Sequence, residues 1–436
     1  MKKIDLPHTI VKVLSILNNA GYEGYVVGGA IRDSFLNIEP TDFDIATNAS
    51  IEEMQSLFNN LKVTNKELKH NTLLLCFSDM NIEITSYRDK EKTLKGDLLL
   101  RDFTINSLAY SKETGIIDYN NGIEDIRNKI IRLNGNDDSR FIEDPIRILR
   151  AIRLSGMLKF KIDEKTINYM FANAHLINDM SKERINDEFT KILLLDKPSL
   201  YLRKYFDIFT SFIPELEPLK GFDQNTPYHI YDCLEHTLVV VDNVEKDKVL
   251  RLAALFHDSG KPHSYTEDEN GIGHFYGHYK ISVDIAKKVL TRLKYDNNTI
   301  KKVLKLIKFH DYPLTLSEKS LKKLIHKFGQ SEIYILLELK KADNLGQNPN
   351  YRNRLNEIEE ARLMIEKIII GDNCFSIKDL KINGKDLIKI GIKEGKEIGY
   401  ILNQLLNLVI NNEISNNYDD LIEKAIEFKK EKDDYK

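Results

Sequence analysis

The sequence predicts an α+β domain at the N-terminus, followed by all-α segments for the rest of the chain. Within residues 1–142, short apolar runs bounded by glycine and asparagine alternate with stretches of helical spacing. From about residue 143 onward, apolar residues recur at helical spacing only. The chain has 436 residues, which is too many for one hydrophobic core, so we expect several domains.

Composition is that of a soluble globular protein, with 42% hydrophobic and 30% charged residues. The net charge of −3 gives no global signal for nucleic acid, so a polyanion site must come from local basic clusters. Three widely spaced cysteines fit a reducing compartment. No signal peptide or membrane span is recognisable, so we expect a cytoplasmic protein with no membrane partner. The sequence is silent on oligomeric state.

The elements of the N-terminal domain follow in order. A helix is expected over about residues 8–20, and a buried strand within YEGYVVGGA (22–30). NTLLLCFSDMNIEITSYR (71–88) predicts two strands. GIIDYNNGIEDIRNKIIRL (115–133) predicts a strand, a turn with glycine, a short helix and a further strand.

Helical spacing then dominates. DPIRILRAIRLSGML (144–158), DEKTINYMFANAHLI (163–177) and SKERINDEFTKILLL (181–195) each place apolar residues along one helix face. Histidines concentrate in the helical stretch after residue 228. We expect four domains: an α+β domain at 1–142, a helical neck at 143–225, a histidine-rich helical domain at 226–350 and a C-terminal helical region at 351–436.

The stretch VVGGAIRDSFLNIEPTDFDIATNA (26–49) carries the first candidate site. Gly28 and Gly29 follow a buried strand and let the backbone approach a ligand closely, because no Cβ intervenes. The helix that follows offers unpaired N–H groups to phosphate, and Arg32 adds a charged fork. Asp42 and Asp44 lie two residues apart, so on a strand they share one face, where they repel each other unless a cation lies between them.

Glu83 in NIEITS leaves two readings open. It alternates with apolar neighbours, so it either adds a third carboxylate from an adjacent strand or is an exposed residue on an edge strand.

The motif Gly28-Gly29-x-x-Arg32-Asp33 followed by Asp42-x-Asp44 resembles the class II tRNA nucleotidyltransferase (CCA-adding enzyme) and bacterial poly(A) polymerase family. That family belongs to the polymerase β-like superfamily. DLLLRDFTINSLAY (97–110) resembles its ribose-recognition motif and EDPIRILRAIR (143–153) its base-recognition helix. CFSIKDLKINGKDLI (374–388) resembles the region that contacts tRNA in longer bacterial members.

The resemblance implies a nucleotidyltransferase head over 1–142, a base-recognition and RNA-binding neck over 143–225, and a tRNA-contacting region over 351–436. It also implies Mg²⁺ on Asp42 and Asp44, which are then catalytic and metal-binding.

Further roles follow from the resemblance for the ribose and base motifs. Asp102 would accept from the ribose 2′-hydroxyl, Arg101 would lie near the phosphates and Asn106 would support their loop. The carboxylate of Asp144 would accept from the exocyclic amine of C or A, and Arg147 would donate to the base edge. Without the resemblance, the arginines of this helix would be a solvated basic stripe. With it, the remaining ones bind phosphate or the RNA end: Arg150 and Arg153.

The histidine-rich segments resemble the HD phosphohydrolase superfamily. The implied ligands are His236, His257, Asp258 and Asp343, with His278 and His310 matching the extra positions of two-metal members. Imidazole and carboxylate suit a transition metal such as Mn, Fe, Ni or Zn. Some longer bacterial nucleotidyltransferases carry such a domain here, with phosphodiesterase or phosphatase activity on cyclic or terminal phosphates.

Two features depart from the family pattern. Leu100 occupies a position that is usually arginine, and only Ser86–Gly96 lie where a long flexible loop is usual. Within the family, a shortened loop marks enzymes that add only the two cytidines.

The expected function is template-independent addition of CCA to tRNA from CTP and ATP. The open alternatives are addition of CC only, poly(A) synthesis, and an HD phosphohydrolase whose N-terminal domain is an RNA-binding module.

Overall fold

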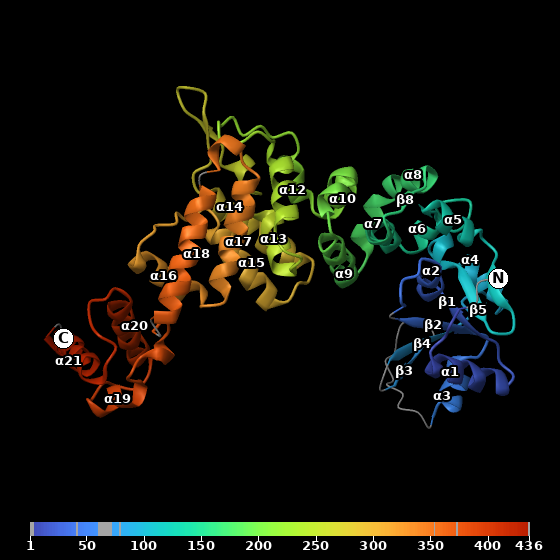
Figure 1. Ribbon diagram of the computed structural model, residues 1–436, viewed down its shortest axis with the longest axis horizontal. Coiled ribbons are helices and arrows are strands. Elements are labelled where there is room, and N and C mark those ends of the chain that lie inside the picture. Colours follow the sequence, from blue (N-terminus) through green and yellow to red (C-terminus); the bar gives the residue numbers. More distant parts are fainter. Residues whose placement is uncertain are drawn as a thin grey trace. The chain divides into compact units, whose positions relative to one another are not determined.

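The computed structural model describes residues 4–40, 42–59, 72–77, 80–352, 354–371 and 374–434. Contacts between Cα atoms divide the chain into two compact units, Met1–Pro214 (unit 1) and Glu215–Lys436 (unit 2). Unit 1 contains a six-stranded sheet with helices, whereas unit 2 is built almost wholly from helices (Figure 1). The predicted fold class is therefore confirmed.

The sheet of unit 1 has the strand order β3-β4-β2-β1-β5-β6. Its strands are β1 (Gly24–Val27), β2 (Phe43–Thr47), β3 (Thr72–Cys76), β4 (Asn81–Ser86), β5 (Leu108–Ser111) and β6 (Gly115–Asp118). β2 and β4 run parallel and place Asp44 opposite Glu83, while the other described neighbours run antiparallel. β4 lies inside the sheet, so Glu83 is not on an edge strand, although its side chain is exposed as that reading expected.

In the described part of this region the sheet is accompanied by α1 (His8–Asn19), α2 (Gly29–Phe35), α3 (Ile51–Leu57), α4 (Leu94–Leu99) and α5 (Gly122–Asn128). α1 buries Ile10, Val13, Leu14 and Leu17, which is the spacing that predicted it. α5 follows β6 and leads into β7 (Ile130–Ile131), as predicted for 115–133.

The rest of unit 1 is helical apart from one short strand. Its helices are α6 (Ser139–Glu143), α7 (Ile146–Leu158), α8 (Glu164–Ala172), α9 (Lys182–Leu193), α10 (Pro198–Lys204) and α11 (Phe206–Phe212). α7 starts after Pro145, whose missing N–H costs nothing at a helix start. It ends at Lys159, whose left-handed φ of 56° turns the chain. The two-residue strand β8 (Lys161–Ile162) then pairs with β7, which helical spacing did not reveal.

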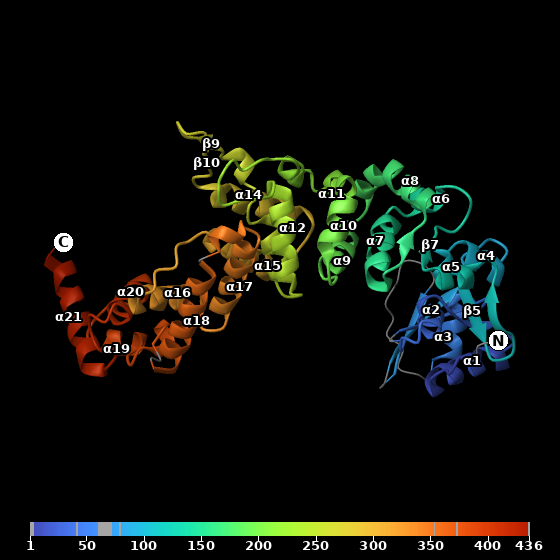
Figure 2. The same ribbon diagram turned by 45° about the horizontal axis from the view of Figure 1, so that its top comes forward.

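Unit 2 begins with the helices around the histidines. They are α12 (Cys233–Asn243), α13 (Lys248–Phe256), α14 (His278–Arg292), α15 (Asn297–Phe309), α16 (Glu318–Phe328), α17 (Glu332–Leu345) and α18 (Arg354–Gly371), and the histidines lie on α12, α14 and α16, directly after α13 and α15, or in the connecting segments. A hairpin of β9 (Thr266–Glu267) and β10 (Gly273–His274) leads directly into α14 (Figure 2).

The C-terminal helices are α19 (Gly384–Lys389), α20 (Lys396–Ile410) and α21 (Tyr418–Asp434). They share a separate apolar core that includes Leu387, Leu405 and Leu421. Across the described ranges, no helix is long and apolar enough to cross a membrane.

Gly260 lets the turn after α13 lie against the start of α14. A Cβ at this position would lie 2.3 Å from the carbonyl oxygen of His278 and 2.7 Å from the backbone nitrogen of Ser282. Neither backbone atom can move away easily, so only glycine permits this approach. Through it, the His257-Asp258 pair comes close to His278.

We expect Gly260→Ala to destabilise unit 2 by about 1–3 kcal/mol, because overpacking forces backbone shifts. The measurement is calorimetry, in which the transition of unit 2 would move to lower temperature. Gly399→Ala is the matched control, since a Cβ there meets nothing within 4 Å. An unchanged transition in Gly260→Ala would show that the close approach is not required.

Candidate functional sites

One cavity in unit 1 collects every residue predicted for the nucleotide site. They reach it from the β1–α2 turn, from the start of β2, from the segment after α4 and from α7. Its lining includes Gly28, Gly29, Arg32, Asp42, Asp44, Arg101, Asp102, Asn106, Asp144, Arg147, Arg150 and Arg153. Residues from three separate motifs therefore face one space.

The acidic side of this cavity is formed by Asp42, Asp44 and Glu83. Glu83 pairs in register with Asp44 on the adjacent strand. Although the Asp44 side chain is solvent-exposed, protein around its carboxyl raises its pKa, and Arg101 and Arg88 oppose the shift. A bound cation would relieve this concentration of negative charge. In the described ranges these three carboxylates do not form a closed cluster, so substrate phosphates would complete the coordination.

The side of the cavity that is expected to bind the phosphates contains two arginines whose guanidinium groups are held by hydrogen bonds. Arg32 donates from Nη1 to Asn106 Oδ1 at 2.6 Å. Arg101 donates from Nε and Nη2 to the fully buried Asp97 at 3.1 and 3.0 Å. Gly28 has a φ of 79°, and a Cβ there would lie 3.4 Å from Arg101 Nη1. The glycine therefore provides both the turn and the room for this guanidinium.

Asp102 lies between these arginines and α7. Its Oδ1 accepts from the Phe103 backbone N–H at 2.8 Å and from Asn106 Nδ2 at 3.1 Å. Burial alone would raise the pKa of Asp102, but Arg150 and these hydrogen bonds outweigh it and lower the pKa. Arg150 Nη2 lies 2.9 Å from Oδ2, yet this buried oxygen accepts no aligned hydrogen bond from the described residues. An ionised acceptor therefore remains available to a hydroxyl.

Asp144 stands between α6 and α7. Its Oδ2 lies 2.7 Å from Arg184 Nη2, while its buried Oδ1 accepts no hydrogen bond within the described chain. Arg147 donates to the carbonyls of Arg140 and Leu100 at 3.3 and 3.2 Å. Leu100 therefore contributes its backbone carbonyl to the site, and a sequence motif, which specifies side chains, does not reveal this contact.

Arg153 differs from its neighbours on α7. Its Nε is paired with Glu188 of α9 at 2.6 Å, which fastens α7 to α9. Binding of phosphate or RNA would have to share this guanidinium with Glu188.

Sequence reasoning missed Arg88 and Arg184, which also line the cavity. Arg88 follows β4, and although its side chain is 41% exposed, the protein around its guanidinium lowers the pKa of that group. Arg184 lies within the predicted helix over 181–195. No local pattern marks either residue, because each reaches the site through tertiary packing.

A second site gathers all six ligand candidates of unit 2. Ligand atoms of His236, His257, Asp258 and Asp343 lie within 4.8 Å of one another, as do those of Asp258, His278 and His310. Asp258 belongs to both groups, so it can bridge two ions.

The distances bring ring nitrogens against carboxylate oxygens. His236 Nε2 lies 3.3 Å from Asp258 Oδ2 and 3.0 Å from Asp343 Oδ1. His278 Nε2 lies 3.3 Å from Asp258 Oδ1. The Nε2 atoms of His236 and His257 are 3.3 Å apart, and those of His278 and His310 are 3.2 Å apart.

The other ring nitrogen of each histidine is anchored to a backbone carbonyl. The Nδ1 atoms lie 3.2, 2.8, 2.9 and 2.7 Å from the carbonyl oxygens of Gly346, Ala254, Phe275 and Ile307, for His236, His257, His278 and His310 in that order. An Nδ1–H donated to a carbonyl leaves a lone pair on Nε2. Two such lone pairs facing each other repel, so the donor set fits a metal ion between them.

Charges within this cluster are strongly coupled. Burial alone would lower the pKa of His257, but Asp258 and Asp343 outweigh it and raise the pKa to about 10. Lys261 lies 2.7 Å from Asp258 Oδ2 and donates to Gln224 at 2.8 Å. Without a metal, protons and Lys261 balance the carboxylates.

His229 was also missed by sequence reasoning. Its ring lies edge-on to His236, with centroids 4.8 Å apart, and its Nε2 is 3.5 Å from Lys261. Burial, with Lys261 nearby, lowers the pKa of His229 to about 2. His229 is therefore neutral beside the ligand set.

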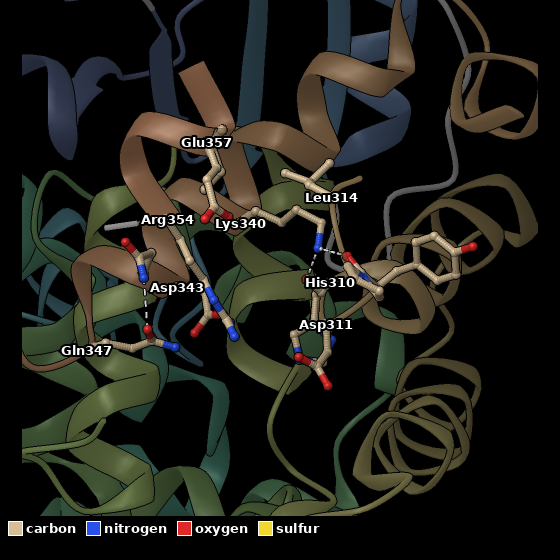
Figure 3. A pocket seen from close by; sticks show the side chains of 12 residues that line it. His310, Asp311, Leu314, Lys340, Asp343, Gln347, Arg354 and Glu357 are labelled. Carbon is tan, nitrogen blue, oxygen red and sulfur yellow. Dashed lines mark hydrogen bonds between the residues drawn. The ribbon is translucent and has the colours of Figure 1, made fainter. Parts of the chain in front are cut away.

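Two cavities reach this cluster, and both are lined by His310, Asp311, Asp343, Gln347 and Arg354. Figure 3 shows one of them, in which Lys340 donates to two backbone carbonyl oxygens. One is the carbonyl of His310, and the other, at 2.6 Å, is the carbonyl of Tyr312. Lys340 thereby ties α17, which carries Asp343, to the end of α15.

Comparison with known proteins bears on both units. Residues 24–132 match the poly A polymerase head domain, residues 159–220 match a probable RNA- and SrmB-binding site of polymerase A, and residues 264–425 match a putative domain 2 of tRNA nucleotidyltransferase.

Similar proteins match either nearly the whole chain or part of it. The CCA-adding enzyme of Ligilactobacillus salivarius is 29% identical over 98% of this chain and 99% of its own. The CCA-adding enzyme of Enterococcus faecalis is 39% identical over 42% of this chain and 48% of its own.

Among solved structures, the Bacillus stearothermophilus CCA-adding enzyme in complex with CTP shares the fold with a TM-score of 0.71. It is 22% identical and covers 99% of this chain and 100% of its own. The Thermotoga maritima CCA-adding enzyme complexed with tRNA has a TM-score of 0.58, with 22% identity over 96% of this chain and 94% of its own. The matched domains, the relatives and the shared fold agree: the chain is a nucleotidyltransferase and is similar over nearly its whole length to CCA-adding enzymes.

Proposed function

We propose that unit 1 adds CCA to the 3′ end of tRNA from CTP and ATP without a nucleic-acid template. The observation that carries this proposal is the convergence of the glycine pair, the Asp42–Asp44 pair and the Asp144–Arg147 pair on one cavity. The CCA-adding names of the relatives support the same activity.

Members of this family work with a divalent metal ion, and we propose Mg²⁺ held by Asp42 and Asp44. The ion would lower the barrier to attack by the tRNA 3′-hydroxyl and stabilise the leaving pyrophosphate. A new bond would form between the 3′-oxygen and the α-phosphorus, and the bond from that phosphorus to the bridging oxygen of the β-phosphate would break.

The chain's own residues would position the nucleotide. Arg32 and Arg101 would bind the triphosphate, and Asp102 would accept from the ribose hydroxyl. The Oδ1 of Asp144, which has no partner among the residues that the structure describes, would accept from the exocyclic amine that C and A share. Arg147 would turn from its carbonyl partners to the base edge.

The short segment Ser86–Gly96 keeps CC-addition open as an alternative. Part of it is already ordered by Asp89, which accepts from the Thr93 backbone N–H at 2.9 Å. An ordered segment would give the pocket less freedom to change from C to A. A poly(A) polymerase is the further alternative within this class.

Product length on tRNA that lacks its 3′ end tests these alternatives. With CTP and ATP, we expect growth by three residues, whereas growth by two with CTP alone and no third step means CC-addition. A long ladder with ATP alone means poly(A) synthesis. Asp42→Ala should reduce extension by at least about a hundredfold, because it removes a metal ligand, while Asp258→Asn should leave it intact. Extension by Asp42→Ala at the unaltered rate would contradict the site.

Arg184→Ala should loosen base selection, because Arg184 holds the Asp144 carboxylate in place. We expect the KM for CTP to rise several-fold to tenfold, and incorporation of UTP to become measurable. Lys182→Ala is the matched control, since Lys182 lies on the same helix but donates to the Asn178 carbonyl at 2.6 Å. An unaltered ratio of CTP to UTP use would show that Arg184 does not act on selection.

A second function is favoured by the anchored imidazoles of unit 2. We propose that this site holds one or two transition-metal ions, of Mn, Fe, Ni or Zn, and hydrolyses phosphate esters. Lys261 and Arg354 would bind the phosphate, and His229 stands neutral beside them. If unit 1 proved unable to transfer nucleotides, its basic cavity would still serve as an RNA-binding module for this hydrolase.

Metal content tests the second site independently of activity. Asp258→Asn should remove most tightly bound transition metal from the purified full chain, measured by mass spectrometry, because Asp258 belongs to both ligand groups. Asp268→Asn is the control, since Asp268 pairs with His274 at 3.1 Å outside those groups. Equal metal content in both variants would contradict the assignment.

A further inference from the structure

The cavity beside the metal ligands of unit 2 carries an unusual group of aromatic side chains at its mouth. The exposed fractions of these residues are 78% for Tyr276, 53% for Tyr228 and 41% for Tyr351. All three line the cavity that also holds Asp258, His278, His310 and Asp343. Apolar surface gathered around a polar pocket marks a binding site more often than chance exposure does.

These rings come from three separate segments and are ordered in pairs. Tyr276 stacks on His274, with centroids 5.3 Å apart and planes 9° apart. Tyr228 meets Tyr351 edge to face at 4.9 Å. Because one face of Tyr276 lies against His274 while the residue stays largely exposed, its other face is open to solvent.

The chemistry of the cavity changes from its mouth to its floor. The exposed rings offer aromatic faces at the mouth, where Arg354 is also exposed, whereas the floor offers the buried Lys261 and the metal-ligand cluster. A ligand that fits both must carry a flat ring at one end and an anion at the other. A nucleobase joined through its sugar to a phosphate has this arrangement.

We propose that this cavity is a nucleotide subsite, in which Tyr276, Tyr228 and Tyr351 bind the base of a nucleoside phosphate or of an RNA end while its phosphate lies at the metal ligands. The inference rests on the proposed hydrolase function for the identity of the reaction. Base binding itself depends on the rings alone. An apolar peptide is disfavoured, because covering the charged Lys261–Asp258 pair and the metal-ligand cluster would remove water from them while offering no polar group in return.

Binding of AMP and of ribose 5-phosphate provides the test, since the two differ only in the base. The full chain, loaded with Mn²⁺, is used in an Asp144→Ala background that weakens base binding in unit 1. We expect AMP to bind more tightly than ribose 5-phosphate in equilibrium dialysis. Tyr276→Ala should weaken AMP binding by about 5- to 100-fold, the effect of losing a base-stacking ring, and leave ribose 5-phosphate unaffected.

Two further variants sharpen the result. Tyr276→Phe keeps the ring and should bind AMP as the parent does. Tyr400→Ala removes another exposed tyrosine, 65% exposed on α20 and outside this cavity, and should have no effect. Equal affinity for AMP and ribose 5-phosphate, or equal weakening of both by Tyr276→Ala, would overturn the nucleotide subsite.

Hydrolysis is measured on the same samples, so that the two ideas can fail separately. Base-dependent binding of AMP without release of phosphate from any adenosine monophosphate would support the subsite and reject the hydrolase. Release of phosphate with the same KM from AMP and ribose 5-phosphate would support the hydrolase and overturn the subsite.

Discussion

Repulsion between like groups that are forced together is the constraint on which both sites depend. In unit 2, imidazole nitrogens face each other at 3.3 and 3.2 Å, and two carboxylates face the same point. In unit 1, the protein around the Asp44 carboxyl raises its pKa, and the negative charge of Asp42 raises it further. Folding holds such groups together only when a cation or a proton can satisfy them. Each unit therefore contains a site where a cation or a proton is needed to offset the repulsion between neighbouring groups.

The two units support these charges differently. Unit 1 uses a sheet, so that register alone puts Asp44 opposite Glu83, while buried Asp97 and Asn106 orient the surrounding arginines. Unit 2 uses helix ends. His257 and His310 each follow the last residue of a helix, where the carbonyl three residues earlier is free to accept from Nδ1. The free carbonyl at the end of each helix thus fixes the orientation of the imidazole ring that follows it.

Much of this could be predicted from the sequence, for a physical reason. Apolar periodicity gives the elements, and a resemblance carried by glycines, aspartates and histidines names the residues that line both cavities. What escaped prediction depends on tertiary packing. The Arg184–Asp144 pair, the Leu100 carbonyl beneath Arg147 and the edge-on ring of His229 leave no mark on local spacing. The short β7–β8 pairing escaped because two residues are too few to show a period.

The carbonyl of Gly346 accepts from His236, while Asp343, one turn earlier, faces the same ligand point. A bound ion would therefore join the start of the histidine-rich region to its end, across more than a hundred residues of chain. Because these ligands meet only in the folded chain, the ion would stabilise this region by binding the folded state, and its contribution would rise with the free concentration of the ion. In a cell starved of that ion, this part of the chain would lose thermal resistance and become easier to digest, while the head could still extend RNA.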